Sequence, residues 1–356
     1  MKKSGWLIGL TLIFLMTLIL TACSGAGNTN SEVKESNETG SEQGSRDGNE
    51  QAVKELEKKK ITIGLPTATA SSFTPIYMAR DKGFYKDEGL EVEVVGMGGN
   101  SQAMQAIAGG SVDIVFTSLS GLVDAIKANQ PMVAFWGYNN GIEFTIHSKT
   151  ADSMADLKGK RIGISSFGGL TDLVTRVGLE KAGLDPEKDV EILVIAGGAQ
   201  PKVAAMETGQ IDAAILTSPT SFSASDEGYK EIFSQADINP TFPTKVAIAS
   251  ESFVKKNPET IKAFLRGLQH GVDYMTENPE EGAKDLVNRV NYEENYSIQA
   301  IEEILPGFPK NGEIDQSGID TFWEIAERAG DVDGTWSDDQ WLDRSFIDTA
   351  KDWLRK

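Results

Sequence analysis

Apolar and polar positions along the chain alternate between the two-residue period of strands and the wider spacing of helices. Short apolar runs predict strands at residues 61–65, 90–95, 112–116, 143–147, 160–164, 190–195, 211–216 and 244–250. Amphipathic segments, several closed by glycine, predict helices at residues 75–82, 101–108, 122–128, 171–182 and 201–208. This alternation favours mainly parallel sheets flanked by helices, and the pattern after residue 250 is helical.

Two segments of the chain share one pattern at an offset of 99 positions. Residues 98–119 and 197–218 each contain a glycine turn, a short helix, a glycine stop and an aspartate that opens an apolar strand. The same offset places Ile63 onto Ile162. Any two strand–helix–strand units share part of this pattern, so chance similarity is the alternative. We interpret the repeat as two similar lobes with a cleft between them.

The N-terminal residues have the pattern of an export signal. Lys2 and Lys3 precede the uncharged apolar run 6–20, and the quartet Leu-Thr-Ala-Cys follows and ends at Cys23. This quartet resembles the lipobox of bacterial lipoproteins, which implies a signal peptide over residues 1–22 and acylation of Cys23, as with palmitate. An uncleaved anchor helix and an ordinary secretory signal are the alternatives.

The segment that follows Cys23 has the composition of a tether. Residues 24–51 contain no aromatic residue and consist mostly of Ser, Gly, Asn and Glu, so they cannot bury enough surface to fold. We expect lipidated Cys23 and a disordered tether over residues 23–58, with a short charged helix at 52–60 leading into the first strand.

Charge and cysteine content exclude several functions. The formal net charge of −19 over 356 residues excludes nonspecific binding to nucleic acid. Cys23 is the one cysteine, so disulfides and thiolate metal sites are excluded within the mature chain, and His147 and His270 are the two imidazoles.

Six loops follow the predicted strands, and none contains a charged residue. They are residues 66–75, 96–102, 117–121, 165–171, 196–200 and 217–223. Ligands bind beyond the carboxyl ends of parallel strands, so we expect these loops to converge on a pocket with an uncharged wall. Recognition would then come from hydroxyls, side-chain amides and backbone N–H groups.

Two turns in these loops lie at predicted helix starts, where free N–H donors favour a small anion. They are Asn100-Ser101 and the run from Gly168 to Thr171. The alternative is that these side chains cap their own helices.

Aromatic residues lie in the same loops and in the predicted crossover between the lobes. Phe73, Phe167 and Phe222 belong to the loops, whereas Trp136 and Tyr138 belong to the crossover. An aromatic wall for an organic ligand and packing between the lobes are both open.

Catalytic and cofactor motifs are poorly represented. The run Gly96-Met97-Gly98-Gly99 misses the dinucleotide fingerprint, and residues 331–334 resemble a calcium loop but lack the later ligands. We therefore expect no cofactor, no metal and no catalytic residue.

Several motifs resemble those of a known family. The run PIYMARDKGFYKDEGLEV at 75–92, with GGNSQA at 98–103, GSVDI at 110–114, ADLKGK at 155–160 and FVKKNPE at 253–259, is similar to the solute-binding proteins of ABC importers for nitrate, sulfonates, taurine and thiamine pyrimidine precursors. The resemblance implies a two-lobed type II periplasmic-binding-protein fold. It also implies ligand contacts at residues 67–73, 100–101, 117–118 and 169–171.

The loop reasoning and the resemblance together define one set of candidate ligand-binding residues. They are Thr67, Ser71, Ser72, Phe73, Asn100, Ser101, Thr117, Ser118, Trp136, Tyr138, Phe167, Gly168, Gly169, Thr171, Thr217 and Ser218. Leu170 stands where the family commonly has serine, which weakens the case for a sulfonate. The run 66–68 lacks the acidic-aromatic signature of pyrimidine-binding members.

These observations predict an extracytoplasmic lipoprotein that captures a small organic solute and delivers it to an ABC permease and its ATPase. We expect a monomer tethered to the outer face of a membrane, as on a Gram-positive cell. The expected division is lobe 1 over 59–146, lobe 2 over 147–243, and a return strand with C-terminal helices over 244–356. The alternatives are an extracellular enzyme on the same scaffold, dependent on His147, and a solute sensor.

Overall fold

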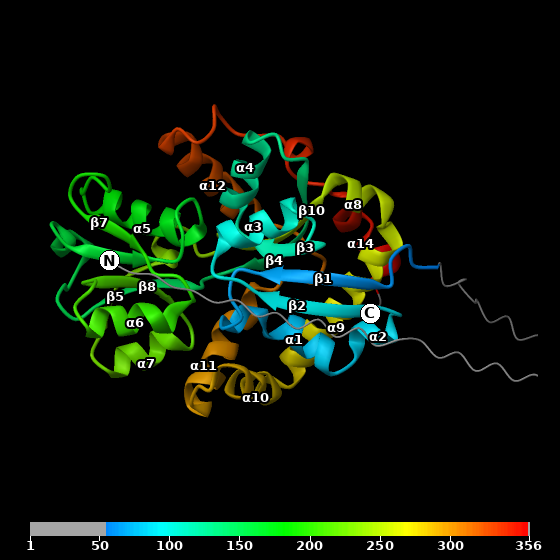
Figure 1. Ribbon diagram of the computed structural model, residues 1–356, viewed down its shortest axis with the longest axis horizontal. Coiled ribbons are helices and arrows are strands. Elements are labelled where there is room, and N and C mark those ends of the chain that lie inside the picture. The colour runs from blue at the N-terminus through cyan, green and yellow to red at the C-terminus, as the bar shows by residue number, and fades with distance from the viewer. Residues whose placement is uncertain (1–54, 355–356) are drawn as a thin grey trace, which may run out of the picture. The chain divides into compact units, whose positions relative to one another are not determined.

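Two five-stranded sheets organise residues 55–354, the residues that the computed structural model describes (Figure 1). We name the part built on the first sheet lobe 1 and the part built on the second sheet lobe 2. The arrangement confirms the two-lobed α/β architecture expected from the sequence.

Lobe 1 is built from the first strands of the described chain and one strand that returns later. Its strands are β1 (Lys60–Leu65), β2 (Glu91–Gly96), β3 (Ile114–Thr117), β4 (Met132–Asn140) and β10 (Pro243–Ser250). Its helices are η1 (Ser71–Phe73), α1 (Thr74–Asp81), α2 (Phe84–Asp87), α3 (Asn100–Ala108) and α4 (Leu119–Lys127). The strand order is β2-β1-β3-β10-β4, with β1 parallel to β2 and β3, and β10 antiparallel to β3 and β4.

Lobe 2 repeats this plan. Its strands are β5 (Phe144–Ser148), β6 (Arg161–Ile164), β7 (Glu191–Val194), β8 (Ala213–Thr217) and β9 (Lys230–Ser234). Its helices are η2 (Met154–Leu157), α5 (Leu170–Lys181), α6 (Ala199–Glu207), α7 (Thr220–Asp226) and η3 (Gln235–Asp237). The strand order is β7-β6-β8-β5-β9, with β6 parallel to β7 and β8, and β5 antiparallel to β8 and β9.

Each sheet is mixed because one of its strands arrives directly from the other lobe. β5 follows β4 after a short crossover, and β10 follows β9 and η3 after a second crossover. The parallel strands of each lobe end at the cleft, whereas a crossover strand begins there. It must therefore run in the opposite direction, which the sequence pattern alone did not indicate.

Hydrogen bonds of the two lobes confirm the sequence repeat. The Asp113 carboxylate accepts a hydrogen bond from the backbone N–H of Thr62 at 3.0 Å. The Asp212 carboxylate accepts one from the backbone N–H of Arg161 at 2.9 Å. Both donors and both acceptors are related by the offset of 99 positions, so the repeat holds at the level of single contacts.

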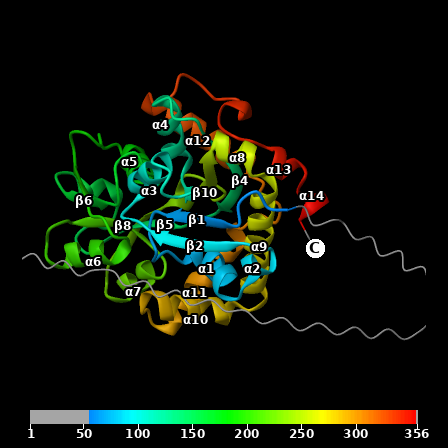
Figure 2. The same ribbon diagram turned by 45° about the vertical axis from the view of Figure 1, so that its right-hand side comes forward.

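The chain after β10 is helical, as expected (Figure 2). Its helices are α8 (Glu251–Lys256), α9 (Pro258–Glu277), α10 (Pro279–Val290), α11 (Glu294–Ile304), η4 (Leu305–Gly307), α12 (Gln316–Ala329), η5 (Asp338–Gln340), α13 (Ser345–Asp348) and α14 (Ala350–Trp353). Helix α9 packs on α1 and α2, where the rings of Tyr85 and Phe264 stack at 5.3 Å. Gly271 allows this approach because a Cβ there would collide with the Pro75 carbonyl. Helix α11 contacts η1 of lobe 1 and α7 of lobe 2.

The N-terminal signals lie outside the described residues. This holds for the expected signal peptide, for Cys23 and for most of the expected tether. Residues 55–59 are not helical, so the described part of the helix expected at 52–60 is absent. Within residues 55–354, no helix has the length and the apolar character that a membrane span requires.

Candidate functional site

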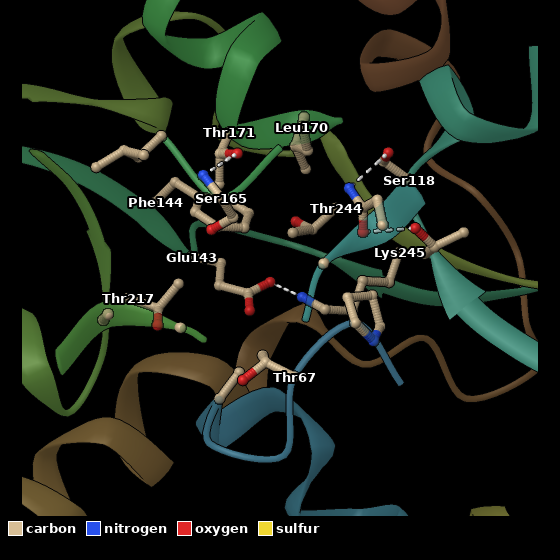
Figure 3. A pocket seen from close by; sticks show the side chains of 18 of the residues that line it. Thr67, Ser118, Glu143, Phe144, Ser165, Leu170, Thr171, Thr217, Thr244 and Lys245 are labelled. Atoms are coloured by element: carbon tan, nitrogen blue, oxygen red, sulfur yellow. Dashed lines mark hydrogen bonds and ion pairs between the residues drawn. The ribbon is translucent and has the colours of Figure 1, made fainter. Parts of the chain in front are cut away.

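A cavity lies between the two lobes, at the carboxyl ends of their parallel strands (Figure 3). Each of the six loops expected from the sequence contributes at least one lining residue. The free volume is about 60 Å³ for the centres of water-sized molecules. That is room for roughly four to six waters, or for a solute with a similar number of heavy atoms.

The cavity brings together seven of the candidate ligand-binding residues. They are Thr67, Phe73, Asn100, Thr117, Ser118, Thr171 and Thr217. The Asn100 amide oxygen accepts a hydrogen bond from Thr117 Oγ1 at 2.7 Å, and the Thr171 hydroxyl accepts one from the backbone N–H of Ser165 at 3.2 Å. These contacts orient side-chain oxygens of both lobes at the cavity wall.

Three helices begin at the cavity with free backbone donors. The N-cap residues of α3, α5 and α6 are Gly99, Gly169 and Gly198, and none of the three has a side chain to cap its helix. Asn100 is the first residue of α3 rather than its cap. The capping alternative for Asn100 and Thr171 is therefore wrong, and the unsatisfied N–H groups with the positive ends of the helix dipoles favour an anion.

The wall contains charges that the loop sequences did not predict. Glu143 lies in the crossover before β5, and Lys245 lies near the start of β10, after the second crossover. Their side chains form a buried ion pair, with 2% and 7% of the side-chain surface exposed, and Ser72 Oγ donates to the Glu143 carboxylate at 3.0 Å. The Lys245 ammonium also lies over the Phe73 ring. The expectation of an uncharged wall was wrong, because the charges come from crossovers and a helix rather than from the six loops.

Lys202 is the third charged residue of the wall. It lies in the first turn of α6, and its ammonium donates to Ser165 Oγ at 2.8 Å and to the Gly198 carbonyl at 2.9 Å. Burial lowers the pKa of Lys202 to about 7, because a desolvated ammonium is disfavoured. The repeat contained the signal for this residue, since Lys202 aligns with Ala103, a buried position of α3.

Glu143, Phe144, Ser165, Leu170, Lys202, Thr244 and Lys245 are lining residues that were absent from the candidate set. Most of them lie in strands, crossovers or a helix turn, where sequence patterns indicate core or surface. The apolar members, Phe73, Phe144 and Leu170, provide a surface for an organic part of a solute.

Four candidate serines lie outside the cavity and make other contacts. Ser71 Oγ and Ser218 Oγ are 3.0 Å apart, and this contact joins lobe 1 to lobe 2. Ser72 orients Glu143. Ser101 is exposed, and its hydroxyl is 3.5 Å from the Phe167 carbonyl.

Trp136 and Tyr138 were expected in the crossover, but they lie in β4 and pack inside lobe 1 rather than line the cavity. The ring of Trp136 lies 5.8 Å from that of Trp353, and the ring of Tyr138 lies 4.7 Å from that of Phe116. The Tyr138 hydroxyl donates to the Ser72 carbonyl at 2.5 Å.

Phe167, Gly168, Gly169 and Phe222 do not line the cavity either. Phe167 is 53% exposed, and Gly168 and Gly169 line separate surface hollows beside α4 and α5. Phe222 is half-buried against the hydrophobic core.

Both histidines lie outside the cavity lining. His147 is buried in β5, where its ring nitrogens contact Thr145 Oγ1 at 2.9 Å and the Tyr229 carbonyl at 3.3 Å. Burial lowers the pKa of His147. The ring of His270 packs against that of Phe84 at 5.9 Å. Among residues 55–354, no group of three or more His, Cys, Asp or Glu side chains is placed to hold a metal ion.

Comparisons of the sequence with known proteins identify one family. A family model described as NMT1/THI5 like matches residues 70–282, which is more than half of the chain. A Brucella abortus protein named as a binding protein is 29% identical over 211 residues, covering 57% of this chain and 63% of that protein. The chain thus aligns with less than two thirds of the length of this relative. The 4-amino-5-hydroxymethyl-2-methylpyrimidine phosphate synthase of Candida albicans is 24% identical over 248 residues, covering 65% and 72%.

Solved structures share the fold. A protein of Bordetella bronchiseptica aligns with a TM-score of 0.72 at 25% identity, covering 84% of this chain and 99% of that one. The alkanesulfonate-binding protein SsuA from Xanthomonas axonopodis pv. citri, bound to MOPS, aligns with a TM-score of 0.67 at 16% identity, covering 82% and 100%. The nitrate-binding protein NrtA from Synechocystis aligns with a TM-score of 0.65 at 17% identity, covering 85% and 92%. The fold is that of periplasmic solute-binding proteins.

Proposed function

Because the chain belongs to the NMT1/THI5-like family and has the periplasmic-binding-protein fold, we propose that it is the solute-binding component of an ABC importer. It captures a small solute between its lobes and presents it to a permease that an ATPase drives. A lipid on Cys23 and the following tether hold it at the outer face of the membrane as a monomer. The observation that carries the proposal is the cavity between the lobes, with the buried Lys202 ammonium in its wall.

The proposed solute is small, organic or nitrate-like, and anionic. Lys202 and the helix starts at Asn100 and Ala199 favour a negatively charged group, while Phe73 and Phe144 suit a short apolar body. The free volume of about 60 Å³ matches nitrate or a short sulfonate in this arrangement of the lobes. A pyrimidine-type compound is larger and requires the lobes to move apart.

Closure of the lobes connects binding to transport. A solute that contacts both lobes binds more tightly when they are closed, so binding shifts the population toward the closed state. The permease would recognise that state. In this proposal lobe 1 begins with the expected residues 59–146 and lobe 2 comprises the expected residues 147–243, except that β5 as a whole belongs to lobe 2 and β10 as a whole to lobe 1. Residues 244–356 supply the return strand and helices that pack mainly on lobe 1.

Calorimetric titration of the purified chain tests the ligand. The panel is nitrate, methanesulfonate, taurine, longer sulfonates and pyrimidines, with Lys202→Met as the variant and Lys256→Met on the exposed surface of α8 as control. We expect at least one anion to bind with micromolar affinity, worth roughly 8 kcal/mol, and Lys202→Met to lose that binding. Absence of binding to the whole panel would count against transport.

Labelling of expressing cells with a fatty acid tests the anchor. Wild-type chain should incorporate the label and fractionate with membranes, whereas Cys23→Ser should do neither. Label in the Cys23→Ser chain would contradict acylation at this residue.

An enzyme on the same scaffold is the second candidate, acting on a sulfur or pyrimidine compound. It is favoured by the resemblance to the Candida albicans synthase. Mass spectrometry of a bound compound after long incubation separates the two functions, because turnover changes the compound and transport binding leaves it unchanged. His147 lies in the core of lobe 2, so a loss of turnover in His147→Gln would have to arise through stability.

A further inference from the structure

Of the three charged side chains of the cavity wall, two form an ion pair with each other and the third contacts neutral groups. Glu143 and Lys245 contact each other, as Figure 3 shows. Lys202 donates to two neutral acceptors, Ser165 Oγ and the Gly198 carbonyl. All three residues are nine-tenths or more buried, so water screens their charges weakly.

The net charge of the wall follows from these contacts. The Glu143–Lys245 pair contributes zero charge whichever of the two groups holds the shared proton. Lys202 contributes one positive charge when it is protonated. The charged side chains of the wall therefore balance one negative charge of a solute, in addition to the partial positive charges of the helix starts.

Glu143 has no role in a wall built simply to attract anions. Without its carboxylate, a protonated Lys245 would face the cavity unpaired, and the wall would then carry two positive charges. With the carboxylate present, a second negative charge on a solute would meet Glu143 and find no free ammonium, and like charges in contact are strongly unfavourable.

We propose that Glu143 is a specificity-determining residue: by neutralising Lys245, it restricts the cavity to solutes that carry a single negative charge. The inference rests on the proposed binding of a small anion and adds the number of charges to it. Sulfate and other dianions are rejected, while a singly charged sulfonate or nitrate is accepted by Lys202.

The competing explanation is structural. Glu143 lies in the first crossover and Lys245 near the start of β10, directly after the second crossover, so their ion pair also links the two connections between the lobes. Loss of such a link would weaken the binding of all solutes alike and lower the melting temperature. It would not change the preference between a monoanion and a dianion, which is therefore the decisive measurement.

The experiment is titration of methanesulfonate and sulfate at about pH 6, where Lys202 is protonated because its pKa is about 7. We expect the wild-type chain to prefer methanesulfonate. Glu143→Gln leaves Lys245 without its partner. Burial lowers the pKa of Lys245, so the wall reaches a charge of plus two when Lys245 takes up a proton together with a dianion. The ratio of the two dissociation constants should then shift toward sulfate by about tenfold or more. Glu143→Gln combined with Lys245→Gln restores the charge of plus one, and the ratio should return to that of the wild type.

A further variant covers the case that Glu143→Gln does not fold. Thr217→Lys adds a positive charge to the wall and leaves the ion pair in place, so it should also shift the preference toward sulfate. An unchanged ratio in a folded Glu143→Gln chain, or in Thr217→Lys where the first variant is lost, overturns the inference while the proposed function stands. A wild-type chain that binds sulfate as well as methanesulfonate, or binds an uncharged compound alone, also overturns it. A wild-type chain that binds no member of the panel removes the proposed function itself.

Discussion

The two lobes have the same backbone plan and different chemistry at the cavity. Gly99 and Gly198 both precede a helix with a positive φ, of 146° and 96°. Gly110 and Gly209 both end that helix, with φ of 71° and 69°. These pairs are again 99 positions apart, so the turns that position the site are repeated.

The side chains at equivalent wall positions differ. Ala103 of α3 corresponds to Lys202 of α6, and the strand registers place Lys245 of β10 at the position of Phe144 in β5. Each lobe therefore presents one ammonium where the other has an apolar side chain. The repeated scaffold therefore determines where a wall residue lies, while single residue differences between the lobes determine whether that position is charged or apolar.

The largest expected effect is on stability, and it arises because lobe 2 has Lys202 where lobe 1 has Ala103. The pKa of Lys202 falls from 10.5 to about 7 on burial, so the folded state disfavours the ammonium by up to about 5 kcal/mol below pH 7. Between pH 7 and 10.5 the unfolded chain binds more protons than the folded chain, and the wild type gains stability as pH rises. Lys202→Met should therefore be more stable than the wild type at pH 6. The loss of two hydrogen bonds reduces this gain in stability, and the gain should disappear toward pH 10.

Urea unfolding at three pH values between 6 and 10 measures this difference. Lys256→Met, at an exposed position of α8, serves as the control and should show no pH-dependent gain. A gain in Lys202→Met that is independent of pH would contradict a titrating ammonium.

The repeated aspartates should be equally important in the two lobes. Asp113→Ala and Asp212→Ala each leave a partly buried N–H without its acceptor, and each should cost about 1–3 kcal/mol of stability. Asp320→Ala, on the surface of α12, should cost less than about 0.5 kcal/mol. Chemical denaturation gives the three values, and a large effect in one lobe with none in the other would break the equivalence.

Contacts between the lobes on the two sides of the cleft should contribute unequally to the stability of the closed state. On one rim, Tyr292 contacts Thr220, and the Tyr296 hydroxyl donates to Asp226 at 2.6 Å, which joins lobe 1 to α7 of lobe 2. Tyr292→Phe should raise the dissociation constant of a bound anion by roughly 3- to 10-fold, because one hydrogen bond of the closed state is lost.

Titration calorimetry measures this effect, with Tyr274→Phe on α9 as the control because its ring packs within lobe 1. On the opposite rim, the longer contact between Ser101 and Phe167 predicts a smaller change for Ser101→Ala. Equal changes in Tyr292→Phe and Tyr274→Phe would show that Tyr292 does not hold the lobes together.

The smallest expected effect is on stability at acid pH, and it concerns a position at which the crossover strands β5 and β10 differ. The registers place His147 of β5 at the position of Ile248 in β10. Burial lowers the pKa of His147, so the wild type loses stability as pH falls below the ordinary value of 6.5, where the unfolded chain takes up the proton first. His147→Gln should lose less stability than the wild type between pH 7 and 5, as measured by thermal unfolding. An identical loss of stability in both chains would contradict this role of His147.

The sequence pattern predicted eight of the ten strands within residues 55–354, the repeat of the lobes and the six loops at the cavity. It missed β4, where a connection was expected, and β9. Local physics carries this information, because glycines at turns, aspartates at strand starts and apolar periods act within a few residues. Asn100, Thr117, Thr171 and Thr217 could be named for this reason before their positions were known.

Which charged residues line the wall depends on the tertiary structure. Glu143 and Lys245 are about 100 residues apart and meet because two strands cross between the lobes in opposite directions. Lys202 occurs in a helix turn that is typical of a solvated surface, yet its side chain is buried in the wall of the cavity between the lobes. Periodicity indicates which face of an element is apolar, but whether a polar residue is buried depends on the distant element that packs against it.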